Sequence, residues 1–272
     1  MLLLRRPAVL LTAVLLILCL RAPAQKPLSA DDELNLGAEA YRQGRFDAAI
    51  EHLKNATSLE PGLVVAHLYL ATVFAQQYIP GAETKDNAYL GEQAIEEYKR
   101  VLDLDPNSPS ASNAMKGIAS LYFNMKKFDD SRQYHKLAIE RDPTDPEEHY
   151  ALGVIDWTLA YKLRTTRMAE LNLEMPSQLI SEPACAEVRR ANQDNVEEGI
   201  AELTQAIKLR PDYDDAMAYM NLLYRERADL HCGDAAAYDA DLKKADEWVD
   251  LAMATKRAKA DRARNGEEHE SH

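Results

Sequence analysis

The chain has 272 residues, of which 45 are acidic and 32 are basic, so its formal net charge is −13. Binding to DNA or RNA requires a basic face, and this balance therefore disfavours nucleic acid as the partner. An acidic surface suits a neutral or cationic partner, or serves solubility alone.

The first 24 residues predict a secretory signal peptide. Arg5 and Arg6 precede an apolar run over residues 8–20, and Ala-Pro-Ala at 22–24 forms a cleavage site of small residues. The apolar run is shorter than the roughly 20 residues that a membrane-spanning helix needs. We therefore expect secretion across a bacterial inner membrane into the periplasm or the extracellular space, with no stable membrane span after cleavage of 1–24.

Four amphipathic segments further along the chain each stop at a proline. In the first, Ala49, Leu53 and Ala56 recur at helical spacing and form one stripe that needs a neighbouring helix. Proline lacks a backbone N–H and disfavours helix at the residue before it. Each segment is therefore predicted to be a helix that ends at its proline. The four prolines are Pro61, Pro106, Pro143 and Pro211.

The residues ahead of the first of these helices carry a known pattern. They resemble the first helix and turn of the tetratricopeptide repeat (TPR), with the matches at Leu36, Gly37, Tyr41, Gly44 and Phe46. The four prolines lie 45, 37 and 68 residues apart, against a period of about 34 residues for this repeat. The resemblance implies an all-α, right-handed TPR solenoid of about five helix-turn-helix repeats over residues 25–255.

Insertions interrupt the predicted solenoid in two places. The stretch "YIPGAETKDNAYLG" at 78–91 separates the two helices of the second repeat, and about one period is inserted at 162–195 within the fourth. Residues 256–272 have no apolar periodicity, which predicts a polar, disordered tail. The stretches "YIPGAET" and "RPDYDDAMAY" make the chain similar to exported bacterial TPR proteins.

The first helix of each repeat lines the concave face of the solenoid in this family. Its inward positions here hold Tyr41, Arg42, Tyr69, Phe123, Asn124, Tyr150, Trp157, Tyr219 and Arg225. Aromatic rings with polar tips offer a large contact area at low entropic cost, so the resemblance implies a groove that binds a protein or peptide. Chaperone-binding members hold a carboxylate clamp at positions that are Leu34 and Ala38 here, which does not support that manner of recognition.

Two interpretations compete with an open groove. The rings can instead pack against the insertions, and the long insertion at 162–195 can itself occupy the groove. A different class of function is a structural component of an envelope assembly, held by its convex face or by self-association. An exposed apolar patch outside the groove would favour that class.

Two cysteines, Cys185 and Cys232, remain after removal of the signal peptide. An even pair in an exported protein predicts a disulfide, which would join the long insertion to the end of the next repeat's first helix. Two separate thiols are the main alternative.

No catalytic motif is present in the sequence. It lacks H-E-x-x-H, G-x-S-x-G, a Walker-type glycine loop and EF-hand spacing, and its seven histidines are scattered. We therefore predict a non-catalytic scaffold without a cofactor or metal, whose partner is a protein or peptide. The sequence leaves its oligomeric state open.

Overall fold

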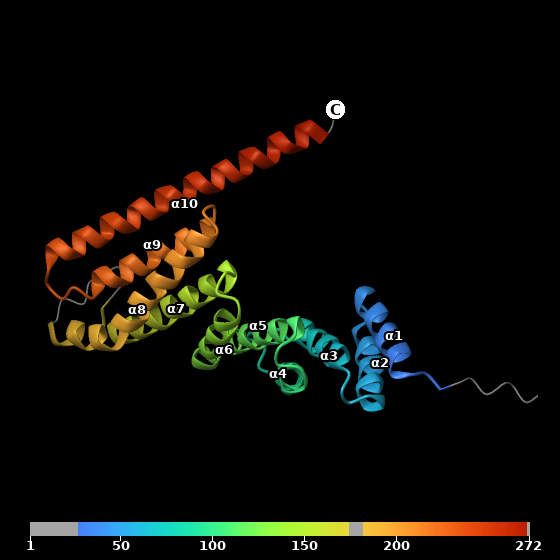
Figure 1. Ribbon diagram of the computed structural model, residues 1–272. Helices are drawn as coiled ribbons and strands as arrows, with labels where there is room; N and C mark the ends of the chain where they lie inside the picture. Colours follow the sequence, from blue (N-terminus) through green and yellow to red (C-terminus); the bar gives the residue numbers. More distant parts are fainter. Residues whose placement is uncertain (1–26, 174–181, 271–272) are drawn as a thin grey trace, which may run out of the picture.

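The computed structural model describes residues 27–173 and 182–270, and this part of the chain forms ten helices. They are α1 (Ala30–Arg42), α2 (Phe46–Leu59), α3 (Val64–Gln77), α4 (Lys85–Leu104), α5 (Pro109–Asn124), α6 (Phe128–Arg141), α7 (Pro146–Glu170), α8 (Glu182–Leu209), α9 (Asp214–Asp229) and α10 (Ala235–Glu270). Each odd-numbered helix packs on the next helix, and each pair packs on the following pair, as Figure 1 shows. The predicted all-α solenoid of five helix-turn-helix units is confirmed. The predicted signal peptide lies outside the described residues.

The predicted prolines end their helices in one common way. Helices α2, α4 and α6 each stop two residues before the proline. The intervening residues, Glu60, Asp105 and Asp142, have nearly the same backbone conformation, with φ between −147° and −134° and ψ between 77° and 88°. This conformation lies outside the α region, which the ring of a following proline disfavours. The repeated turn therefore follows from a single residue type.

Small residues let the two helices of a repeat interlock. A Cβ atom added to Gly37 would lie 2.6 Å from Cγ of Leu53, and one added to Gly153 would lie 2.5 Å from Cγ of Leu203. Both leucines are fully buried. The predicted small-residue positions therefore exist because a leucine of the second helix fills the space that a side chain would take.

Two buried histidines fix the start of a repeat to the turn before it. His67 Nδ1 lies 2.6 Å from a carboxylate oxygen of Glu97, and its Nε2 lies 3.1 Å from the carbonyl oxygen of Pro61. His149 contacts Glu202 at 2.5 Å and the carbonyl of Pro143 at 3.1 Å. Each ring thus connects the first helix of a repeat, its second helix and the preceding proline turn.

The apolar side chains form two separate core clusters. One cluster runs from Ala40 to Leu121 across α1 to α5, and the other runs from Ala160 to Leu230 across α7 to α9. Between them, α6 meets α7 and α8 through charged groups: Arg132 lies 2.5 Å from Asp156 and 2.8 Å from Glu198. Asp156 is fully buried, and this burial raises its pKa to about 7. Each half therefore has its own apolar cluster, and a buried charge pair lies at the junction of the halves.

The long insertion is helical in its described parts. Residues 162–170 continue α7 and residues 182–195 begin α8, so these two helices have 25 and 28 residues. Buried Asn192 of α8 donates a hydrogen bond to the carbonyl of Ala160 in α7 at 2.8 Å. The insertion therefore extends the helical pair of the fourth repeat, and its described residues do not form a separate loop.

The prediction of a disordered tail differs from the structure, in which α10 continues through Glu270. The stretch "TKRAKADRAR" after Ala254 combines good helix formers with no glycine or proline. Two of its cations also reach back to the beginning of α9, since Lys259 pairs with Asp214 at 2.5 Å and Arg262 pairs with Asp212 at 3.2 Å. The prediction relied on the lack of an apolar stripe in this segment. High helix propensity and these ion pairs favour the helix without such a stripe.

Candidate functional site

The aromatic residues predicted to line one groove gather most densely on α7 and α9. The ring of Tyr219 lies 5.7 Å from that of Tyr150 and 5.4 Å from that of Trp157, edge-on in both cases. Tyr213 and Tyr161 extend the group, at 4.9 Å from Tyr150 and 5.3 Å from Trp157. These five rings, called here the α7–α9 aromatic cluster, form a continuous chain of ring contacts between α7 and α9, in which Tyr213 is buried.

The rings of this cluster are partly core and partly surface. Tyr150, Trp157 and Tyr219 pack against the second core cluster yet stay half-exposed, and Tyr161 is 39% exposed. Burial raises the pKa of Tyr150 to about 12, so its hydroxyl remains a neutral donor at physiological pH. Such a surface offers ring faces and hydroxyl groups together, which suits contact with a peptide main chain.

Charged groups hold one end of the cluster in place. The Tyr213 hydroxyl donates a hydrogen bond to Glu147, and Arg210 lies 4.4 Å from the centre of the Tyr213 ring. Arg210 also pairs with Glu147 at 2.7 Å. Tyr213 therefore has a fixed orientation, although the inward pattern of the repeat did not select it.

The other predicted site residues lie in separate groups. Tyr41 and Tyr69 form an edge-on pair at 6.4 Å, whereas Phe123 contacts Phe128 at 5.6 Å. Arg42 pairs with Glu39 on its own helix, Arg225 pairs with Asp246 of α10 at 2.7 Å, and Asn124 is the last residue of α5. The structure thus brings three of the nine residues, Tyr150, Trp157 and Tyr219, into one cluster and does not join all nine through ring contacts.

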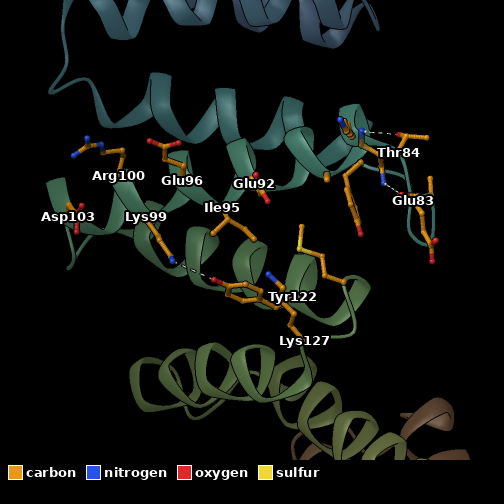
Figure 2. Close-up of a pocket in the computed structure, with 16 residues that line it drawn as sticks. Glu83, Thr84, Glu92, Ile95, Glu96, Lys99, Arg100, Asp103, Tyr122 and Lys127 are labelled. Carbon is orange, nitrogen blue, oxygen red and sulfur yellow. Dashed lines mark hydrogen bonds between the residues drawn. The ribbon is translucent and has the colours of Figure 1, made fainter.

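A pocket of about 840 Å³ opens elsewhere, where α4 meets the end of α5. Figure 2 shows Ile95 and Lys99 of α4 facing Tyr122 of α5, with Glu83 and Thr84 at the far end. One wall is the segment 78–84, the first part of the interruption in the second repeat. We call this space the α4–α5 pocket. The sequence analysis did not predict this pocket. The interruption of the second repeat was the signal that could have indicated it, because residues inserted between the two helices of a repeat lie on its surface.

Residues 34–82 and 91–146 match the family model described as tetratricopeptide repeat. These residues therefore belong to the tetratricopeptide-repeat family. The match omits residues 1–33, residues 83–90 within the interruption, and everything after Pro146, the first residue of α7. No curated protein sequence matches the chain.

Solved TPR structures share the fold of this TPR protein. The crystal structure of MamA is 16% identical, with a TM-score of 0.57 over 85% of this chain and 94% of that one. MamA from residue 41 to its end, from Desulfovibrio magneticus RS-1, is 15% identical with a TM-score of 0.56, over 84% of this chain and 96% of that one. YrrB, described as a TPR protein with an unusual peptide-binding site, is 13% identical with a TM-score of 0.54, over 84% and 87% of the two chains.

The predicted disulfide of this TPR protein is present. Cys185 near the start of α8 is bonded to Cys232 in the turn after α9, and their Cα atoms are 5.5 Å apart. Beside it, buried Arg164 pairs with Glu226 at 2.7 Å and with Asp229 at 3.3 Å. The described part of the insertion therefore contacts α9 through its charges and its cysteine.

The described residues also bear on metal binding and on crossing a membrane. Over 27–173 and 182–270 there is no group of three or more His, Cys, Asp or Glu side chains that could hold a metal ion. In the same ranges no helix combines the length and the apolar character that crossing a bilayer requires.

Proposed function

We propose that this TPR protein is an exported, non-catalytic scaffold that binds a protein or peptide partner through aromatic residues on the first helices of its repeats. The observation that carries the proposal is the α7–α9 aromatic cluster, in which Tyr150, Trp157 and Tyr219 pack on the second core cluster and stay partly exposed to solvent. Rigid, half-exposed aromatic rings are the side chains that most often dominate binding energy at interfaces. YrrB, which has a similar fold, is described as having a peptide-binding site, and this supports peptide binding as the proposed role.

Export is supported by two independent features. The sequence of residues 1–24 has the organisation of a signal peptide. The Cys185–Cys232 disulfide suits an oxidising compartment such as the periplasm or the extracellular space.

The test is chemical crosslinking of the protein in its own envelope fraction, followed by identification of the crosslinked partners by mass spectrometry. Tyr161→Ser removes the most exposed ring of the cluster, and Tyr89→Ser serves as the matched control because Tyr89 is 49% exposed and lies on α4, outside the cluster. We expect Tyr161→Ser to lose partners that Tyr89→Ser retains. Trp157→Ala should lose them more completely, at some cost in melting temperature because Trp157 is half-buried.

The proposal fails if Tyr161→Ser and Trp157→Ala keep every partner of the wild type while the crosslinking itself is efficient. A melting temperature that falls sharply in Trp157→Ala, with no change in partners, would assign the cluster to the core alone.

A second candidate function, a structural component that self-associates, rests on a patch of α10. Val249, Leu251 and Met253 are 37%, 44% and 52% exposed there, and Val249 and Met253 share one face of the helix at i and i+4. Light scattering at rising protein concentration measures the mass of the particle directly. Self-association that Val249→Lys with Met253→Lys abolishes would support this candidate, and a constant monomer mass would exclude it.

A further inference from the structure

The contact of α6 with α7 and α8 lies between the two apolar core clusters and contains a buried carboxyl group. The first cluster ends at Leu121 of α5, the second begins at Ala160 of α7, and Asp156 of α7 lies in the contact between them. We propose that this contact is a pH-sensitive hinge, which is held closed when the carboxyl group of Asp156 is neutral and opens more readily when it is charged. This inference does not depend on the proposed binding function.

Three helices enclose the carboxyl group. Arg132 of α6 lies 2.5 Å from one of the oxygens of Asp156. A Cβ atom added to Gly199 of α8 would lie 2.9 Å from Cβ of Asp156, so α8 approaches α7 closely at this point. Asp156 is fully buried. Because the side chain is withdrawn from water, neighbouring protein groups have to stabilise any charge that it carries.

The stabilisation available to a charged Asp156 is incomplete. Among the described residues, neither of its two carboxyl oxygens has a hydrogen-bond partner. Its nearest cation is shared, because the guanidinium group of Arg132 also donates to Glu198 at 2.8 Å and to Asn195 at 3.1 Å. A buried carboxylate that shares its cation and lacks hydrogen bonds is costly, whereas a neutral carboxyl group avoids most of this cost.

Charged groups face the buried carboxyl group from both neighbouring helices and oppose one another. Arg132 and Lys136 of α6 favour its charged form, whereas Glu198 and Glu202 of α8 disfavour it. Lys136 is itself paired with Glu198 at 2.6 Å, and Glu202 contacts His149 of α7 at 2.5 Å. Burial is the largest effect, and with the two glutamates it raises the pKa of the buried carboxyl group to about 7.

Opening of the contact would return Asp156 to water, where an aspartic acid has a pKa of about 3.9. Between about pH 4 and pH 7 the closed contact therefore binds a proton that the open contact releases. Closure is thus stabilised at acidic pH, and this stabilisation is lost as the pH rises through 7. In the described part of the chain, neither core cluster contains residues from both sides of the contact, so opening leaves both clusters intact.

The experiment is hydrogen exchange of the purified protein at pH 5 and pH 8, with each rate corrected for the intrinsic exchange rate at that pH. Helix α6 has 14 residues, a length that is marginal without packing, so its amides exchange when the contact opens. We expect its protection factors to fall by about 10- to 100-fold from pH 5 to pH 8. Asp156→Asn keeps the shape of the neutral acid and should remove most of this change.

Two matched controls separate Asp156 from other titratable groups. His135 of α6 lies 2.7 Å from Glu148 of α7, across the same pair of helices, so His135→Gln should keep the change if Asp156 causes it. Burial also raises the pKa of Asp229, to about 6, but this residue is the last of α9. Asp229→Asn should therefore keep the full change in α6.

A second variant tests the hinge independently of the folding of Asp156→Asn. Glu198→Gln removes a carboxylate that opposes the charge on Asp156, so the midpoint of the change should move to lower pH. The inference is overturned if α6 of the wild type is equally protected at pH 5 and pH 8, or if Asp156→Asn retains the full change. A midpoint that Glu198→Gln leaves in place, or a change that His135→Gln or Asp229→Asn abolishes, also overturns it.

Discussion

Helices α1 to α5 surround a core of apolar side chains, whereas α7 to α9 surround a core that also contains paired charges and a disulfide. The first half buries Leu53, Leu70, Phe74 and Ile118. The second half buries the Arg164–Glu226 pair as well as its apolar residues, and Cys185 is bonded to Cys232 above it. The family match follows this division, since it covers repeats of the first half and ends at the beginning of α7.

The contrast shows what happens when a repeat is lengthened. The added turns of α7 and α8 bury apolar residues such as Met168 and Val188, and they also bring charged residues into contact with α9. A buried cation is tolerable only beside buried carboxylates. The second half therefore depends on specific partners, and the first half depends on close packing.

Removing the central cation of the second half should have the largest effect. Arg164→Met would leave Glu226 and Asp229 buried without a cation, and we expect a loss of about 3–5 kcal/mol in the free energy of unfolding. Burial already raises the pKa of Asp229 to about 6 with Arg164 present. Denaturant unfolding measures the loss. The matched variant Arg225→Met breaks an exposed pair with Asp246 and should cost under about 1 kcal/mol. Equal losses in the two variants would contradict the contrast.

Removing the disulfide should have the next largest effect, restricted to one half. Cys185→Ser combined with Cys232→Ser should cost about 2–4 kcal/mol, since the unfolded chain regains the freedom of a closed loop. Hydrogen exchange should rise in α7 to α10 and stay unchanged in α1 to α5. Reduction of the wild type provides the control and should give the same pattern. If exchange rises equally along the whole chain, the two halves unfold as one unit.

A matched pair of glycine substitutions should show where the halves are alike. Gly37→Ala and Gly153→Ala each place a Cβ against the buried leucine of the partner helix, so each should cost about 1–3 kcal/mol. Thermal unfolding of the two variants measures this. Similar losses would show that the glycine–leucine contact contributes equally to stability in both halves. Stabilisation by either alanine would show that the leucine moves aside freely.

The smallest effect should come from the histidine contacts and should depend on pH. The hydrogen bond to Glu97 is the main cause that raises the pKa of His67, so protonation stabilises the folded state. This contribution is complete below the unfolded pKa of about 6.5 and disappears as the pH rises through the higher folded pKa. His67→Gln should therefore cost more at pH 6 than at pH 9, by less than about 1.5 kcal/mol.

Stability measured across this pH range tests the prediction, and a loss independent of pH would contradict it. His149→Gln removes the same two contacts in the second half and shows whether they have equal weight there.

The regular features of the fold could be predicted because each depends on one or two local residues. Prolines end α2, α4, α6 and α8, and Gly37 and Gly153 mark helix contacts, so the proline spacing together with the resemblance to the tetratricopeptide repeat located the repeats. The disulfide was predictable because Cys185 and Cys232 are the only cysteines in the sequence after residue 24. Ser131 also fits this class, since its hydroxyl donates to the carbonyl of Ala119, another small-residue position.

The candidate sites were less predictable because they depend on contacts between distant segments. The family pattern selected Tyr150, Trp157 and Tyr219 but not Tyr213, which reaches them from the turn before α9. The α4–α5 pocket requires the path of residues 78–84, which Asn87 fixes through three hydrogen bonds to this loop. The length of α10 was missed because ion pairs to α9, rather than an apolar stripe, accompany it.

The position of the disulfide also sets how the molecule would respond to tension. The two cysteines are 47 residues apart, and both lie in the second half. If the chain is pulled from its ends, every residue of α1 to α6 can add to the extension, but the stretch between the cysteines cannot. At about 3.6 Å per extended residue, the bond withholds roughly 170 Å of contour length until it is reduced. When such a protein is anchored at one end and pulled at the other, its first half would therefore extend fully, whereas the residues of α8 and α9 between the two cysteines would not extend.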